Sequence, residues 1–172
     1  PMPTPAFISI EGSTQGLITQ GAFTEDSVGN IYIEGHEDEV MVQAFDHTVT
    51  IPRDPQSGQP AGQRVHKPFI FTAALDKSTP LLYNALTSGE VLTNTEMRWY
   101  RTSIAGKQEH FFTMKLEDAI IVNIDAKMPH CQDPATQDFT QLIEVSLSYR
   151  KITWSHDVAG TEGSDDWRAP LV

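Results

Sequence analysis

The longest run of alternating apolar and polar side chains lies between residues 139 and 154. Alternation with a period of two is typical of a β-strand with one buried face. The apolar side chains before residue 150 share one parity, and those after it have the other. The first set is Ile143, Val145, Leu147 and Tyr149, and the second is Ile152 and Trp154. Because a shift of one residue moves side chains to the opposite face, the slip at residues 150–151 predicts a β-bulge or a strand that changes sheets.

Period-two alternation recurs along most of the chain, which predicts a mostly β fold. The ranges that carry it are 7–10, 40–51, 69–75, 90–101, 109–116 and 119–127, with shorter runs at 17–19 and 31–33. Strands of this kind pack face to face or close on themselves to bury their apolar sides. The pattern therefore supports a sandwich or a barrel of about eight to ten strands.

One segment, residues 79–88, has the pattern of a helix. Ser78 and Thr79 place a capping hydroxyl just before Pro80, and Gly89 supplies a C-terminal stop. Between them, apolar side chains recur at helical spacing. These side chains are Leu81, Leu82, Ala85 and Leu86. The sequence thus predicts a single short helix that flanks the core.

Two segments are irregular. Residues 52–64, PRDPQSGQPAGQR, hold three prolines and two glycines and cannot enter a sheet interior. We expect them to project as a loop from a single domain that spans residues 2–156, with Met2 as the natural start. Residues 157–172 have the composition of a C-terminal surface tail, tethered by Trp167.

The charge balance excludes several classes of partner. With 23 acidic and 12 basic residues, the net charge of −11 repels phosphate backbones and anionic lipid headgroups. We therefore expect neither nucleic-acid binding nor membrane insertion. The N-terminal residues lack the basic start and apolar run of a secretory signal. The single cysteine, Cys131, excludes an internal disulfide and fits a protein made in a reducing cytoplasm.

The sequence carries little catalytic chemistry. The acidic turn at residues 34–39, EGHEDE, offers metal-ligand side chains but matches neither calcium-loop nor HExxH spacing, so a solvated turn is favoured. His130 and Cys131 are adjacent, and neighbours on an extended chain point to opposite faces, which does not suit a base and its nucleophile. There is no Gly-rich phosphate loop and no G-x-S-x-G elbow. We predict no enzyme, no metal and no cofactor.

Several collinear stretches then point to a family. They include GHEDEVMVQAFDHTVTIPRDPQSGQPAGQRVHKPF, DKSTPLLYNALTSGE, MRWYRTSIAGKQEHFFTMKLEDA and VSLSYRKITWSHDVAGTEGSDDW. With them, essentially all of residues 2–167 resembles the haemolysin-coregulated proteins (Hcp) of type VI secretion systems, specifically the enterobacterial branch. The helix opening at residues 77–80 and the segment at 151–154 are the pieces shared most widely in that family.

The resemblance implies two antiparallel sheets that form a barrel-like core, with one short helix flanking it at residues 79–88. It also implies a structural subunit that forms a hexameric ring. Such rings stack into the inner tube of the secretion system, meet its spike and sheath components, and carry effector proteins in their lumen. The protein would be cytoplasmic when assembled and then secreted through the system without a signal peptide. The family has no catalytic residues to carry over. Its stacking loop matches residues 52–64, with the candidate contacts Arg53, Asp54, Gln56, Gln59, Gln63 and Arg64.

A candidate lumen surface follows from the residues themselves. A polar strand broken by Gly29 lacks the clean inward alternation of the core strands. We therefore predict that Ser27, Asn30 and Tyr32 face the lumen and contact effectors.

Two alternatives remain open. One is a ring-shaped effector chaperone that binds cargo but does not polymerise. The other is a hydrolase with a dispersed site built on Asp46, His47 and distant carboxylates.

Overall fold

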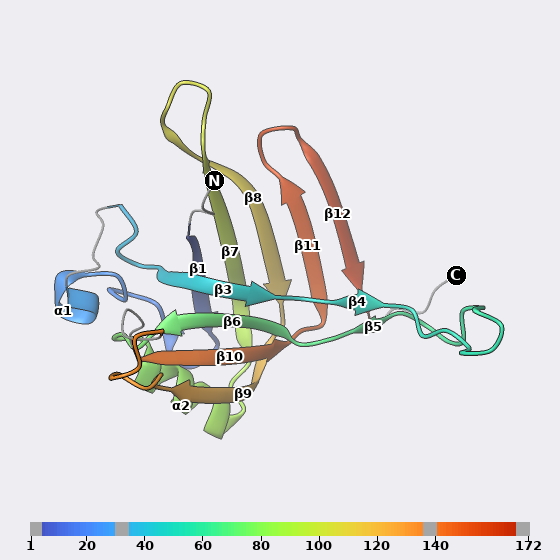
Figure 1. Cartoon of the computed structure of the whole chain (residues 1–172), viewed down its shortest axis with the longest axis horizontal. Helices are drawn as coiled ribbons and strands as arrows, with labels where there is room; N and C mark the ends of the chain where they lie inside the picture. Colours follow the sequence, from blue (N-terminus) through green and yellow to red (C-terminus); the bar gives the residue numbers. More distant parts are fainter. Residues whose placement is uncertain (1–4, 30–34, 136–140, 168–172) are drawn as a thin grey trace.

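Most of the described strands form one long, bent antiparallel sheet, and two short strands form a separate ribbon (Figure 1). The computed structural model describes residues 5–29, 35–135 and 141–167. The strands are β1 (Ala6–Gly12), β2 (Gly16–Leu17), β3 (Val40–Asp46), β4 (Val49–Thr50), β5 (Val65–His66), β6 (Phe69–Ala74), β7 (Leu92–Thr102), β8 (Gln108–Glu117), β9 (Ile120–Lys127), β10 (Leu142–Ser148), β11 (Lys151–His156) and β12 (Thr161–Asp166). The helices are α1 (Glu25–Val28) and α2 (Thr79–Ser88).

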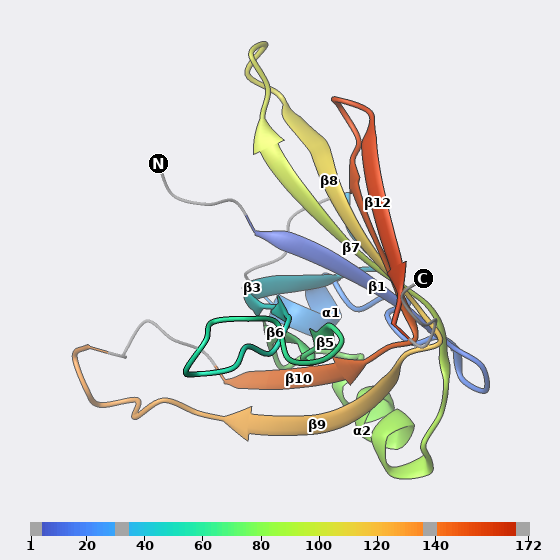
Figure 2. The same ribbon diagram turned by 90° about the vertical axis from the view of Figure 1, so that its right-hand side faces the viewer.

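The main sheet has ten strands in the order β12-β11-β8-β7-β1-β3-β6-β10-β9, and β2 pairs with β1 beside this path. In Figure 1, β7, β8, β11 and β12 run across the direction of β3, β6, β10 and β9. Figure 2 shows these two halves diverging from each other, with β1 between them. The fold is mostly β, as predicted, but the barrel-like closure of two sheets is not confirmed.

β1 joins the two halves because it pairs with both. Its residues Ala6–Ile8 pair with β3, and Phe7–Gly12 pair with β7. The register of the second pairing shifts between Glu11 and Gly12. A β-bulge of this kind bends and twists a strand, which lets one sheet turn and fold over its own apolar face.

The core lies between the two halves. Val145 and Leu147 of β10 are fully buried, and so is Ile152 of β11. Strand β10 pairs with β6 and β9, whereas β11 pairs with β8 and β12. The change of parity at residues 150–151 therefore marks the passage of the chain from one half of the sheet to the other, which confirms that prediction.

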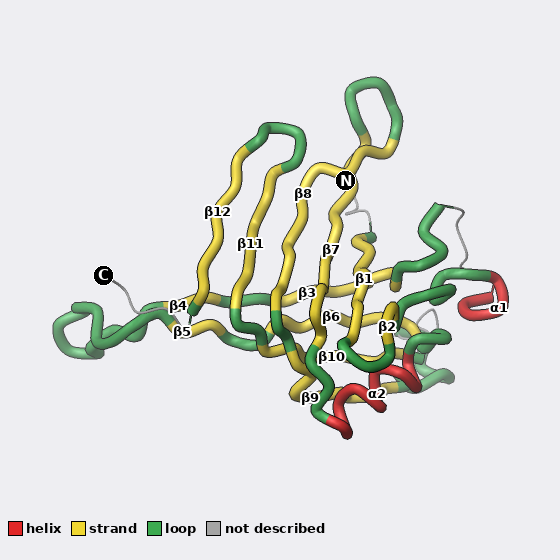
Figure 3. The backbone as a smooth tube through the Cα atoms, turned by 180° about the vertical axis from the view of Figure 1, so that it is seen from behind, coloured by secondary structure: helices red, strands yellow, loops and turns green. Residues whose placement is uncertain are grey.

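Helix α2 lies against β9, as the view from behind shows (Figure 3). Its buried residues include Leu82 and Ala85, and it ends at Gly89 in the left-handed conformation, with φ of 69°. Ser78 occupies the N-cap position, but its side chain does not make the expected capping hydrogen bond to the helix. Its hydroxyl instead donates to Asp76 at 2.5 Å. The described residues add a helix that was not expected, the single turn of α1.

The irregular segments contain more pairing than the sequence suggested. Residues 49–66 form a two-stranded ribbon, β4 and β5, that extends away from the main sheet (Figure 1). A further bridge joins Arg53 to Pro60 beyond these strands. The expected tail contains β12, which pairs with β11 along its whole length. In the described part of the chain, neither helix is long and apolar enough to cross a membrane.

Candidate assembly surface

The projecting ribbon, residues 49–66, is an ordered hairpin. Asp54 organises its tip, since its carboxylate accepts a hydrogen bond from Gln56 N at 2.8 Å and its backbone exchanges bonds with residues 58 and 59. The backbone N–H of Ala61 donates to the carbonyl of Pro52 at 2.7 Å. The ribbon also exposes apolar side chains, with Val49, Ile51 and Val65 between 41% and 48% accessible. Ordered, exposed apolar surface of this kind is typical of a contact with another protein.

The six predicted stacking residues do not form one group. Five of them are exposed, namely Arg53, Asp54, Gln56, Gln59 and Gln63, and the first four lie toward the tip. Arg64 instead lies at the root of the ribbon, with its side chain 10% accessible. Its Nε and Nη2 donate to the two carboxylate oxygens of Asp165 at 2.8 and 2.9 Å, and Nη2 also donates to the carbonyl of Asp166. This guanidinium is therefore engaged within the chain.

The Arg64–Asp165 pair continues into a hydrogen-bonded chain that we call the root cluster: His47, Arg64, His66, Tyr149 and Asp165. His66 Nε2 lies 2.7 Å from Asp165 Oδ2, and its Nδ1 lies 2.6 Å from the Tyr149 hydroxyl. The same hydroxyl lies 2.7 Å from His47 Nε2. The His66 side chain is only 2% accessible. The cluster thus ties both strands of the ribbon to the body of the sheet.

The environment shifts the ionisation of the root cluster. Burial lowers the pKa of His47, and the nearby His66 lowers it further, against an opposing effect of Asp46. The hydrogen bond from Arg64 holds the pKa of Asp165 below its ordinary value despite partial burial. Burial, with the charge of Asp165, raises the pKa of Tyr149 well above 10, so Tyr149 keeps its proton. Sequence reasoning missed this cluster because its hydrogen-bonded partners lie far apart in the chain, with His47 and Tyr149 separated by 102 positions.

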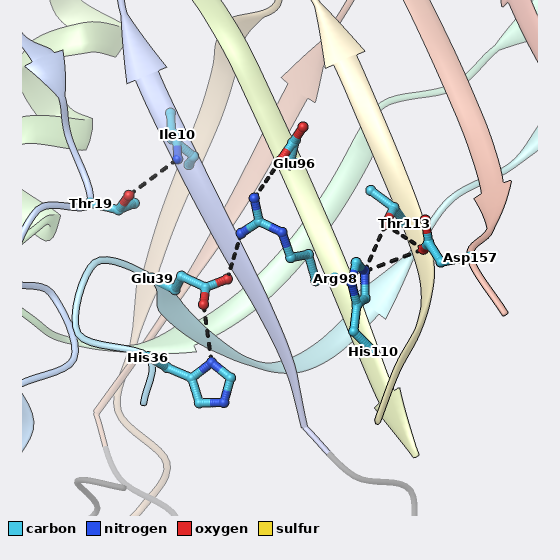
Figure 4. Close-up of polar contacts among 9 residues, drawn as sticks. All are labelled: Ile10, Thr19, His36, Glu39, Glu96, Arg98, His110, Thr113 and Asp157. Atoms are coloured by element: carbon cyan, nitrogen blue, oxygen red, sulfur yellow. Dashed lines mark hydrogen bonds and ion pairs between the residues drawn. The ribbon is translucent and has the colours of Figure 1, made fainter. Parts of the chain in front are cut away.

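A second polar network covers the face of β7 and β8 shown in Figure 4. Glu39 receives hydrogen bonds from both sides, from Arg98 Nη1 at 2.8 Å and from His36 at 3.0 Å. Arg98 also pairs with Glu96 on its own strand. Burial alone would lower the pKa of Arg98, but the hydrogen bond and charge of Glu39 raise it. The network fixes the acidic turn against the sheet.

A neighbouring trio, His110, Thr113 and Asp157, has the residue types of a catalytic triad but not its geometry (Figure 4). Thr113 donates to Asp157 at 2.8 Å, and His110 Nε2 contacts Thr113 at 2.7 Å and Asp157 at 3.3 Å. A triad needs the carboxylate on one ring nitrogen and the nucleophile on the other. Here one nitrogen meets both, so the trio does not form a triad.

The alternatives that involve chemistry also lack a site. His47 makes its hydrogen bond to the Tyr149 hydroxyl, which keeps its proton and is not an activated nucleophile. In the acidic turn, the His36 ring stacks on Phe7 with ring centres 3.7 Å apart. Within the described residues, no three His, Cys, Asp or Glu side chains come together in a way that could hold a metal ion.

Of the three predicted lumen residues, the structure describes one. Ser27 lies in α1, where its hydroxyl accepts a hydrogen bond from the backbone N–H of Lys77 at 2.8 Å. It lines an open hollow of about 700 Å³, together with Thr24, Asp26 and Asp76. Asn30 and Tyr32 lie outside the described residues. Ser27 is half-buried and contacts the segment just before α2, and Figure 1 shows α1 at the end of the sheet away from the ribbon.

Comparisons with known proteins identify the family. A family model described as "Type VI secretion system effector, Hcp" matches residues 7–156. The chain belongs to the Hcp family. A solved structure titled "Crystal structure of Hcp protein" is 63% identical, covers 96% of this chain and 99% of its own, and superposes with a TM-score of 0.92. The fold described above is therefore that of an Hcp.

The branch within the family differs from the one expected. A "Major exported protein" of Pseudomonas aeruginosa is 66% identical and covers 99% of both chains. The Hcp1 protein of Escherichia coli EAEC 042 is only 31% identical, with a TM-score of 0.78 over 95% of this chain and 98% of that one. The enterobacterial assignment is thus not supported, because the resemblance rested on stretches that the Pseudomonas relative shares at high identity.

Membership of this family gives the general function. Hcp proteins are the tube and secreted proteins of type VI secretion systems, so this chain is a structural, secreted protein and not an enzyme. The hexameric ring is typical of Hcp structures.

Proposed function

We propose that this chain forms hexameric rings that stack into the inner tube of a type VI secretion system. The ring is assembled in the cytoplasm, meets the spike and sheath components there, and is secreted without a signal peptide. Effector proteins travel in its lumen, and Ser27, Asn30 and Tyr32 contribute to the surface that accepts them. Membership of the Hcp family supports these assignments, and the name of the Pseudomonas relative, "Major exported protein", supports the secretion.

The projecting ribbon is the element that joins one ring to the next, and its geometry is the observation that carries this proposal. It is ordered by its own hydrogen bonds and anchored at its root, yet its tip leaves the body of the sheet (Figure 1). Such a hairpin presents a preformed surface, which reduces the conformational entropy lost on binding. Its exposed Arg53 gives it a cation in a chain of net charge −11. A cation here is complementary to the acidic surface of a neighbouring ring.

The test replaces residues 53–63 with a short Gly/Ser linker. We expect hexamers and their melting temperature to be unchanged, because the main-sheet core does not use these residues and loop length changes closure entropy only slightly. Tubes and secretion should be lost. Native mass spectrometry, electron micrographs and secretion assays measure the three properties. A matched control shortens another projecting hairpin, residues 103–107 between β7 and β8, and should keep its tubes.

The outcomes also separate the proposal from its alternative. Rings that never form tubes in the wild type, at any concentration, would favour the non-polymerising effector chaperone. Tubes that persist in the linker variant would show that another surface stacks the rings. Loss of hexamers would place the ribbon inside the ring.

A further inference from the structure

The root cluster contains one hydroxyl shared between two imidazoles. Tyr149 Oη lies 2.7 Å from His47 Nε2 and 2.6 Å from His66 Nδ1. A phenol has a single hydrogen, so it can donate to one of these nitrogens and must accept from the other. The two histidines belong to the two ends of the ribbon, whereas Tyr149 follows β10 in the body of the sheet (Figure 1). The ionisation of these imidazoles therefore acts on the attachment of the ribbon.

With both histidines neutral, every bond has a donor and an acceptor. Asp165 is a carboxylate and accepts, so His66 Nε2 carries the hydrogen at that 2.7 Å contact. His66 Nδ1 is then bare and accepts the Tyr149 hydrogen. Tyr149 Oη in turn accepts from His47 Nε2–H. One added proton is also accommodated. On His47 it changes the direction of no hydrogen bond. On His66 it makes Nδ1 a donor, and the Tyr149 hydroxyl then donates to His47 Nε2, which is unprotonated in the other tautomer of that ring.

A second added proton breaks this pattern. Both nitrogens that face Tyr149 then carry hydrogens, and the phenol hydrogen has no acceptor among these groups. Two imidazolium cations would also lie on either side of one hydroxyl, where like charges at short range repel strongly. The cluster can hold one extra proton but not two.

The charged groups around the cluster do not remove this repulsion. Asp165 contacts His66 at 2.7 Å but shares its single negative charge with Arg64, and Asp166 pairs with Arg150 at 2.7 Å. Lys67 lines the same small hollow as His66 and Tyr149 and adds a further positive charge. Asp46, beside His47, is the opposing carboxylate and is exposed to solvent. Cations thus face the doubly protonated pair from the ribbon and from the sheet.

We propose that the root cluster fixes the direction of the ribbon and releases it when His47 and His66 are both protonated, so that acidification uncouples stacked rings. This inference rests on the proposed role of the ribbon in stacking. Burial and the nearby His66 hold the pKa of His47 below its ordinary 6.5, so double protonation is disfavoured at neutral pH and the release requires acid.

The experiment measures the mobility of the ribbon directly, in the full chain and under conditions where it has not assembled into tubes. A fluorescent dye is attached at Ser57→Cys, at the exposed tip, in a Cys131→Ser background, and its anisotropy is followed from about pH 7.5 to about pH 5. A dye at Lys107→Cys, on the other projecting hairpin, is the matched control. The variants are His47→Gln, whose amide can donate to Tyr149 but does not bind a proton, and Tyr149→Phe, which removes the shared hydroxyl.

We expect the anisotropy at Ser57→Cys to fall on acidification while that at Lys107→Cys stays constant. His47→Gln should abolish the fall, and Tyr149→Phe should give the low value at every pH. A constant anisotropy in the wild type, an equal fall at Lys107→Cys, or the same pH profile in His47→Gln would overturn the inference.

Micrographs of wild-type tubes, taken separately over the same pH range, distinguish this inference from the proposed function. If the ribbon loosens in acid and tubes persist, the root cluster acts as inferred but the ribbon does not stack the rings. If the 53–63 linker variant loses tubes while acid leaves the ribbon fixed, the stacking role holds and the acid release does not.

Discussion

Glu90 accepts hydrogen bonds from Gln15 at two points, the backbone N–H at 2.9 Å and the side-chain amide at 3.0 Å. It also accepts the backbone N–H of Thr14 at 3.0 Å. Its carboxylate thereby closes the turn between β1 and β2 against the segment that follows α2. Gly12 makes this arrangement possible, since a Cβ at that position would collide with the carboxylate.

We therefore predict that Gly12→Ala destabilises the fold. The added methyl group displaces the Glu90 carboxylate, so the donors of Thr14 and Gln15 lose their acceptor. Loss of hydrogen bonds to a charged group costs about 1.5 to 3 kcal/mol each at most sites. Urea unfolding should show a lower midpoint than in the wild type. Gly163→Ala is the comparison, because its backbone is not left-handed and its Cβ would meet only the Trp154 ring at 3.9 Å, an ordinary contact. A larger loss there than at Gly12 would contradict the assignment.

The Glu90 carboxylate also makes the free energy of unfolding depend on pH. Burial alone would raise the pKa of Glu90, but the bonds from Gln15 and Thr14 outweigh it, so its pKa lies below the ordinary 4.5. A folded-state pKa below the unfolded value means stabilisation that is full above pH 4.5 and is lost as pH falls through the folded pKa. Glu90→Gln should be less stable than the wild type at neutral pH, and the difference should shrink in acid. A difference in unfolding free energy that stays constant with pH would argue against this.

Arg53 and Arg64 lie near the two ends of residues 52–64 and provide a matched comparison. Arg53 is exposed, whereas Arg64 is bonded to Asp165 and Asp166. We predict that Arg64→Gln lowers the melting temperature and loosens β12, because it removes the contact between the ribbon and that strand. Arg53→Gln should leave the melting temperature unchanged and weaken ring stacking. Calorimetry and amide hydrogen exchange over residues 161–166 measure the first effect, and micrographs the second. The reverse assignment of effects would refute the division into tip and root.

Ser27 tests the proposed lumen surface. A photo-crosslinker at this position should capture effector proteins in cells that are actively secreting. The same label at Lys107 is the control, and we expect it to capture no cargo. Capture at Ser27 of neighbouring rings, but never of cargo, would remove this residue from the lumen.

The local sequence predicted the elements of this fold better than their arrangement. Val145 and Ile152 have opposite parity because their strands pair with different neighbours, and that signal is present in the sequence itself. Alternation does not show how many sheets the strands form, however. That depends on β1 pairing with both β3 and β7, which is a property of the whole chain.

Strand β12 and the root cluster were not predicted from the sequence, and the physical reason is the same for both. Strand β12 has the sequence TEGSDD and no apolar alternation, because it is held by its backbone pairing with β11 and not by a buried face. The root cluster left no local trace either, since Arg64 and Asp165 are 101 positions apart. Projection of the ribbon could be predicted from its prolines, but its anchor could not.

The residues that anchor the ribbon are synthesised at different times. A ribosome makes the chain from its N-terminus, so residues 49–66 emerge long before Tyr149, and Asp165 follows later still. Until β12 is synthesised, the ribbon has no carboxylate to hold Arg64 and His66 at its root. The ribbon can form its own hydrogen bonds early, but its direction is fixed only once Asp165 has been made. We therefore expect a nascent or C-terminally truncated chain to present the proposed stacking surface without a fixed direction.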